Sequence, residues 1–215
     1  MWLTLRLALC TTGILLVLGL PIAHWLANSR CRLKFLVESV VAMPLILPPT
    51  VLGFYLLVAM GPHSPVGRFW EGLTGGTLPF TFAGILIGSV IGNLPFAVRP
   101  FTASFASVDR RLTEASWCLG ASRTRTFFRV TLPLSRAGVL TGLVLTFAHT
   151  VGEFGVVLMI GGNIPAVTRT LSIAIYDDVQ ALDYGAAGMT SLALLAFAFF
   201  TLCVTYALQK KAPLA

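Results

Sequence analysis

The chain has 215 residues, of which 56% are hydrophobic and 11% are charged, and its formal net charge is +7. So high an apolar fraction excludes an ordinary soluble domain, and the length suits one membrane domain, residues 1–215, with no appended soluble domain. The basic residues stand in loops between apolar runs, which is typical of an inner-membrane protein and not of a nucleic-acid-binding protein.

Two apolar runs open the chain. The first extends from about Leu3 to Ala27, and we predict a retained membrane span because the run is long and lacks a well-placed signal-peptide cleavage site. The second extends from about Phe35 to Met60. Three prolines inside it predict a span that is bent or locally broken: Pro44, Pro48 and Pro49.

A loop rich in glycine and proline, Gly61 to Leu78, leads to a third apolar run, from about Pro79 to Phe105. Four residues interrupt this run: Asn93, Pro95, Arg99 and Pro100. We expect a helix break at Asn93-x-Pro95, because an internal proline removes a backbone hydrogen bond.

The segment from Asp109 to Pro133 is basic and too polar to cross a bilayer. Apolar residues at helical spacing predict a narrow stripe on a short helix: Val108, Leu112, Ala115 and Leu119. Gly120 would end that helix in a left-handed conformation, and Ser122 would cap a second short helix. Pro133 suits the first turn of the next apolar helix.

Two further spans complete the chain, from about Leu134 to Ile160 and from about Tyr184 to Leu208. The linker between them, Gly161 to Asp183, is acidic toward its end. We therefore expect an all-α integral membrane protein of about five spans.

The distribution of basic residues predicts the orientation. One set of loops is rich in them, at Arg30 to Lys34, Arg110 to Arg136, and Lys210 with Lys211. The opposite loops hold only Arg68 and Arg169, and Arg6 lies near the N-terminus. The positive-inside rule then places the N-terminus outside, with the Asp109–Pro133 segment and the C-terminus in the cytoplasm.

Several kinds of site find no support in the sequence. The three histidines, His24, His63 and His149, do not stand at ligand spacing from Cys, Asp or Glu, so we expect no metal site. The four cysteines are scattered, without CxxC spacing. No GxxxxGK[ST] sequence occurs and no nucleophile has a plausible base, so we expect neither ATP binding by this chain nor an enzyme.

One motif carries functional information. Glu114-Ala115-Ser116, Gly120 and Val130-x-Leu132-Pro133 resemble the EAA signature of bacterial ABC importer permeases, EAA-x3-G-x9-I-x-LP. The spacing is met in full, with Ser116 in place of Ala and Val130 in place of Ile. The resemblance implies a type I ABC importer permease fold, in which residues 107–133 form a coupling loop that docks on the ATP-binding subunit. The docking residues would be Glu114, Ala115, Ser116, Gly120, Leu132 and Pro133.

Further stretches are similar to the permease subunits of molybdate importers, the ModB type. They are PLILPPTVLG from Pro44 to Gly53, GEFG from Gly152 to Gly155, and GNIPAVTRT from Gly162 to Thr170. This resemblance implies a permease for molybdate or tungstate in the bacterial inner membrane. Sulfate or another oxyanion is the alternative substrate, and a channel or a non-transporting membrane anchor is the alternative class.

The resemblance also implies partners. The permease would be a homodimer, joined by two ATP-binding subunits that hold ATP and Mg²⁺ and by an extracytoplasmic oxyanion-binding protein. This chain itself would bind no cofactor.

A tetrahedral dianion is best carried past many weak donors, because a fixed cluster of cations would trap it. Hydroxyls, amides and the freed N–H groups of broken helices are such donors. The candidates for the lining are Thr50, Ser89, Asn93 and Thr150. For each hydroxyl, a bond to its own helix backbone is the competing interpretation.

Two charged residues lie in the apolar runs. Glu153 would repel an anion if ionised, so we expect a structural or gating role, with Arg99 as one possible partner and a protonated carboxyl as another possibility. Arg99 lies toward the cytoplasmic end of the third span, where it would either extend to the interface or act near the inner mouth.

Overall fold

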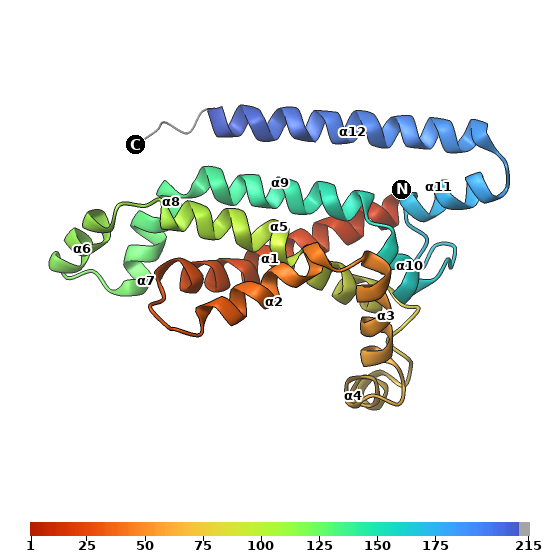
Figure 1. Cartoon of the computed structure of the whole chain (residues 1–215), viewed down its shortest axis with the longest axis horizontal. Coiled ribbons are helices and arrows are strands. Elements are labelled where there is room, and N and C mark those ends of the chain that lie inside the picture. The colour runs from red at the N-terminus through yellow and green to blue at the C-terminus, as the bar shows by residue number, and fades with distance from the viewer. Residues whose placement is uncertain (211–215) are drawn as a thin grey trace.

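The computed structural model describes residues 1–210, which form helices and connecting loops without a β-strand. The long helices α1 (Trp2–Asn28), α5 (Phe82–Ala106) and α9 (Arg136–Gly152) pack lengthwise against one another, and α12 (Tyr184–Lys210) lies along α9 (Figure 1). The loop that carries α6 projects from one end of this bundle, and the N-terminus lies toward the other end. Lys211 falls outside the described residues.

The structure has three to five candidate membrane spans, and the upper number agrees with the five that we expect. Three described helices, α1, α5 and α12, are each long and apolar enough to cross a membrane. Two bent pairs reach that length together: α2 (Lys34–Ile46) with α3 (Pro49–Met60), and the segment Arg123–Leu134 with α9.

The second span is broken where the prolines predict it. The axes of α2 and α3 differ by 114°, and both Leu47 and Pro48 between them are extended. A proline disfavours the helical conformation of the residue before it, so Pro48 and Pro49 together hold two extended residues at the bend. Pro49 then starts α3, where a missing N–H is tolerated.

One expectation about a break was wrong, and one further break was not predicted. The helix α5 runs unbroken through Asn93, Pro95 and Pro100, because packed neighbours in a membrane bundle tolerate a lost backbone bond. The fourth span, in contrast, is not one helix: α9 ends at Gly152, and α10 (Gly155–Gly161) begins after two non-helical residues. In the fourth span the break is flanked by two glycines, Gly152 and Gly155.

The predicted loops contain short helices. The loop after the second span holds α4 (Pro65–Thr74), which Ser64 caps by accepting a hydrogen bond from the Gly67 N–H. The linker before α12 holds α11 (Leu171–Gln180). Pro133 lies in the three-residue helix α8 (Leu132–Leu134) and not in the long helix that follows, because the chain bends at Ser135.

The buried core consists of two apolar clusters. The inner cluster lies near the α6 end and includes Leu15 of α1, Ala97 and Phe101 of α5, and Val139 of α9. The outer cluster includes Leu7 of α1, Ile85 of α5, and the buried side chains of α10. Along α1, Thr11 falls between the two clusters, and along α5, Ser89 and Asn93 do. A buried polar layer therefore separates the two clusters.

Candidate functional site

The basic loop is a helix, a turn and a second helix, as predicted. Asp109 caps α6 (Arg110–Cys118), its Oδ1 accepting from the Arg111 N–H at 2.9 Å. Gly120 has φ +80°, the left-handed conformation that a turn here requires. Ser122 caps α7 (Arg123–Thr126), its Oγ accepting from the Arg125 N–H at 3.3 Å. These caps define where both helices start.

A hydroxyl contact joins the two helices of the loop. The Oγ of Ser116 on α6 lies 3.0 Å from the Oγ1 of Thr126 on α7, and Thr126 is 3% exposed. Ser116 stands where the EAA signature has Ala, so the substitution adds a hydrogen bond that an alanine could not make. The loop is thereby held as one unit.

The apolar face of α6 is open to solvent. Leu112 is 49% exposed and Leu119 is 89% exposed. Together with Ala115 and Ser116 they line a hollow of about 430 Å³. Exposed apolar side chains around a hollow of this kind are typical of a protein–protein contact.

The other predicted docking residues lie in different surroundings. Glu114 is exposed, and no ion pair joins it to any residue in the described part of the chain. Pro133 is exposed, after the π-helical turn Phe127–Thr131. Leu132 is half-buried against the inner cluster. Its side chain therefore anchors the loop to the bundle and does not face outward.

The polar layer holds a hydrogen-bonded cluster of three side chains. The Asn93 Nδ2 donates to Glu153 Oε2 at 2.9 Å and to the Ser89 carbonyl at 2.8 Å. The His149 Nδ1–H donates to Asn93 Oδ1 at 3.0 Å, and the His149 ring stacks on Phe96. Asn93 is fully buried and Glu153 is 7% exposed. Asn93 thus fixes the carboxyl group at the break between α9 and α10.

Arg99 is not the partner of Glu153, contrary to the possibility raised above. Arg99 is exposed on α5 and, together with Glu38, lines a cavity toward the end of the bundle that carries α6. Among the described residues its guanidinium forms no ion pair within 4.0 Å, and Glu38 pairs with Lys34 at 3.3 Å. Arg99 lies six residues past Asn93, about two helical turns away.

The breaks in the second and fourth spans adjoin each other. A Cβ added at Gly155 would lie 2.7 Å from the Pro49 Cβ, so only glycine allows this approach. Thr50 is exposed beside this contact, at the start of α3. Gly152 and His149 are exposed at the end of α9. This surface combines a hydroxyl, an imidazole and the chain around two helix breaks.

The remaining predicted lining residues are buried within the chain. Ser89 is fully buried, and its hydroxyl has no hydrogen-bond partner in the described residues. Thr150 is 1% exposed, and its hydroxyl donates to the Thr146 carbonyl of its own helix. Ser89, Asn93 and Thr150 therefore lie inside the helix bundle, and they would reach a passage only if the helices around them separate.

The stretch Gly162–Thr170 folds into a tied loop. The Asn163 amide donates to both carboxylate oxygens of Asp177 at 2.6 Å, and Arg169 Nη2 lies 3.2 Å from Asp177 Oδ2. The Thr168 hydroxyl donates to the Gly161 carbonyl at 2.7 Å. These bonds hold the linker against α11.

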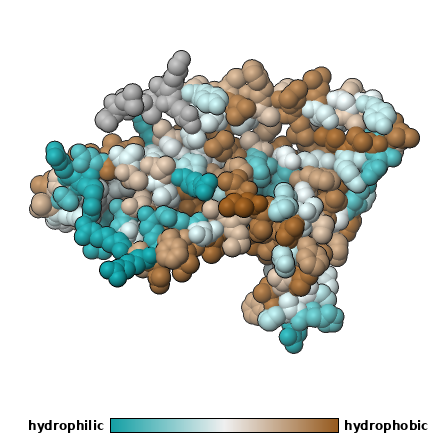
Figure 2. Space-filling model, viewed as in Figure 1, coloured by the Kyte–Doolittle hydropathy of each residue, from teal (hydrophilic) through white to brown (hydrophobic). Residues whose placement is uncertain are grey.

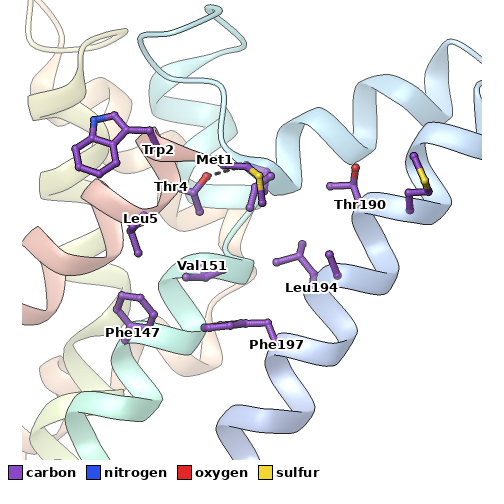
Figure 3. Close-up of a pocket in the computed structure, with 12 residues that line it drawn as sticks. Met1, Trp2, Thr4, Leu5, Phe147, Val151, Thr190, Leu194 and Phe197 are labelled. Atoms are coloured by element: carbon purple, nitrogen blue, oxygen red, sulfur yellow. Dashed lines mark hydrogen bonds between the residues drawn. The ribbon is translucent and has the colours of Figure 1, made fainter.

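A large cavity of about 660 Å³ lies between α1, α9 and α12 (Figure 3). Its lining is mostly apolar, with Leu5, Phe147 and Phe197 among its walls (Figure 3). Such a lining suits hydrocarbon and not a dianion.

Sequence reasoning missed His149, because it looked for metal-ligand spacing only. The available signal was positional: His149 and Glu153 are four residues apart, one helical turn, in a run otherwise rich in apolar residues. Among the described residues, no three metal-ligating side chains converge.

Comparison with known proteins places the chain among transport proteins. Residues 16–212 match the family described as "Binding-protein-dependent transport system inner membrane component". The molybdenum transport system permease protein ModB of Azotobacter vinelandii is 52% identical over 208 residues, which cover 97% of this chain and 92% of that protein. A probable sulfate transport system permease protein of Prototheca wickerhamii is 32% identical, over 91% of this chain and 76% of that protein. A structure of the MetNI methionine ABC transporter, with inward-facing conformations, is similar in fold, with a TM-score of 0.74 at 17% identity, over 98% of this chain and 93% of the matched chain.

Proposed function

This chain belongs to the family of inner membrane components of binding-protein-dependent transport systems, and we propose that it is the permease subunit of an ATP-driven importer of molybdate or tungstate. It is a multi-pass inner-membrane protein and a transport subunit, not an enzyme. The observation that supports molybdate or tungstate as the substrate is the 52% identity to a molybdenum permease over nearly the whole chain. The identity to a sulfate permease is lower, at 32%.

The loop α6–α7 is the proposed contact with the ATP-binding subunit. Its exposed apolar face, with Leu112, Ala115 and Leu119, supports this role, because it offers a hollow into which a partner can pack. Glu114 is free to bond a basic partner side chain. Gly120 sets the turn, Ser116 joins the helices, and Pro133 follows at the loop's exit; Leu132 transmits the loop's movement to the bundle.

The proposed assembly has two copies of this chain and two ATP-binding subunits, with an extracytoplasmic oxyanion-binding protein on the outer face. ATP and Mg²⁺ are held by the ATP-binding subunits. The match to a family of binding-protein-dependent transporters supports this arrangement.

We propose that the coupling loop and the C-terminal end face the cytoplasm and that the N-terminus faces outward. Hydrophilic residues gather at the end that carries α6, α7 and the loop between α1 and α2 (Figure 2). The basic residues of these segments support a cytoplasmic position for this end. The helix α12 also returns to this end of the bundle.

The proposed anion path runs over the surface where the two breaks adjoin. Thr50 offers a hydroxyl on that surface. Ser89, Asn93 and Thr150 form the layer behind it, and the Ser89 hydroxyl, which has no partner among the described residues, can donate if the helices part. Glu153 has the gating or structural role, because Asn93 holds its carboxyl at the break.

The test is a reconstituted transporter in proteoliposomes with its ATP-binding subunit and binding protein. We expect molybdate or tungstate, but not sulfate, to stimulate ATP hydrolysis, and the Gly120→Asp variant to lose the stimulation. Stimulation chiefly by sulfate would keep the architecture and overturn the substrate. If no oxyanion stimulates hydrolysis and the variant behaves as the wild type, the chain is a channel or an anchor instead.

A further inference from the structure

A second hollow lies on the opposite face of α6 from the apolar one. It has a volume of about 240 Å³ and is bounded by the ends of α1 and α5 and by the coupling loop. Arg110, Thr113 and Trp117 face it from one side of α6. Arg123 faces it from α7, and His24 with Asn28 from the last turns of α1. Three separate segments of the fold thus converge on one small space.

The hollow is positively charged. Arg110 and Arg123 both line it, and no carboxylate does. Neither guanidinium forms an ion pair with any residue among 1–207, although Glu114 stands four residues after Arg110. The other nearby acids are engaged: Asp109 caps α6, and Glu38 on α2 pairs with Lys34. Two guanidinium groups that share a concave space without a counter-charge favour an anion there.

Neutral hydrogen-bonding groups complete the hollow. Thr113 lies at its wall on α6, where its hydroxyl donates to the Arg110 carbonyl at 2.7 Å, and the buried Thr126 hydroxyl lies at its wall on α7. Asn28 lies at its wall on α1 and donates to the His24 carbonyl at 2.9 Å and to His24 Nδ1 at 3.2 Å. The His24 ring packs edge-on against Phe105 and Phe127, which close the hollow on its apolar side.

The volume of the hollow and its position in the bundle indicate which class of anion it can hold. A volume of about 240 Å³ equals about eight water molecules, enough for one tetrahedral oxyanion with a partial shell of water. The hollow lies where two long membrane helices end at the basic end of the bundle, the level at which lipid phosphates meet a protein.

We propose that this hollow binds a phosphate-class oxyanion, held by the guanidinium groups of Arg110 and Arg123. The ligand is either the headgroup phosphate of an anionic lipid or a free tetrahedral oxyanion. Bound between α6 and α7 beside the end of α1, it fills the space between the coupling loop and the bundle and so limits the movement of the loop relative to the bundle.

The experiment measures binding to the complete transporter with its ATP-binding subunits, purified in detergent and freed of lipid. Labelled phosphatidylglycerol and labelled inorganic phosphate are titrated separately, and phosphatidylcholine serves as the zwitterionic comparison. The test variant is Arg110→Gln/Arg123→Gln. The matched control is Arg30→Gln/Arg32→Gln, which removes the same charge from the same basic end of the bundle but from side chains outside both hollows of the coupling loop.

We expect the test variant to weaken binding at least about tenfold and the control to stay within about threefold of the wild type. The variant Arg110→Lys/Arg123→Lys, which keeps the charge, should bind at an intermediate strength. Saturable phosphatidylglycerol binding that phosphate does not compete identifies a lipid headgroup, whereas saturable phosphate binding identifies a free oxyanion.

Three results would overturn the proposal. The first is equal weakening by the test and control variants, which indicates a general charge effect. The second is the absence of saturable binding of either ligand to the wild type. The third is binding to the isolated chain that disappears in the complete transporter, which indicates that the partner subunit fills the hollow. None of these measurements depends on which oxyanion is transported.

Discussion

Replacing Asn93 with leucine tests the polar layer directly. Leucine has as many side-chain heavy atoms as asparagine, but it removes the hydrogen bonds to Glu153, to the Ser89 carbonyl and to His149, and it leaves a carboxyl group that is 7% exposed without its partner. Three lost bonds at about 1 kcal/mol each predict a loss of about 3 kcal/mol in the free energy of unfolding. For a chain of this length, that corresponds to a fall of roughly 6–12 °C in Tm.

The assay is thermal unfolding in detergent, followed by tryptophan fluorescence. Thr150→Val is the matched control, because the Thr150 hydroxyl bonds only its own helix backbone, and its Tm should fall by less than about 3 °C. A double variant, Asn93→Leu with Glu153→Leu, should lose less than the sum of the single losses, with a coupling free energy of about 1–2 kcal/mol. A Tm for Asn93→Leu equal to that of the control, with additive losses in the double variant, would refute the assignment of Asn93 as the residue that holds Glu153.

Three further variants probe the loop and the breaks. Gly120→Ala should lower the free energy of unfolding by about 1–2 kcal/mol, because alanine disfavours the left-handed backbone here, and it should lower oxyanion-stimulated ATP hydrolysis. Gly120→Asn should retain most of the stability and most of the stimulation, because asparagine tolerates this conformation. Equal effects of the two variants would contradict the role of the positive φ. Ser116→Ala and Thr126→Val should each lower the free energy of unfolding by about 1 kcal/mol, measured by thermal unfolding. The double variant should lose no more than about the larger of the two single losses. Additive losses would show that the two hydroxyls do not bond each other. Gly155→Val should cost about 1–3 kcal/mol and reduce uptake, because the new Cβ meets Pro49, and normal melting with normal uptake would show that the breaks need not touch.

The fold of the loop that carries α6 and α7 was predictable because each of its signals is local. The cap at Ser122 and the turn at Gly120 depend on residues within one helical turn, and the structure places both as expected. The bend at Pro48 is local in the same sense. The positions of the long helices α1 and α12 follow from the apolar runs alone.

The errors arose where distant contacts decide the outcome. Pro95 does not break α5, because α1 and α9 pack along it and support the helix. Glu153 bonds Asn93, sixty positions away along the chain, and no spacing rule predicts that pairing over the one with Arg99. The burial of Ser89 likewise depends on how three helices pack, which their periodicity alone does not specify.

The division of the core into two clusters has a mechanical consequence. Phe127 and Leu132, which follow α7, pack against the inner cluster only. A displacement of the loop that carries α6 and α7 would therefore be transmitted first to the helices of the inner cluster. It reaches the outer half through α1 and α5, the helices that contribute to both clusters. These two helices connect the clusters rigidly. The rigidity of the polar layer between the clusters then determines how much of the displacement reaches the outer cluster.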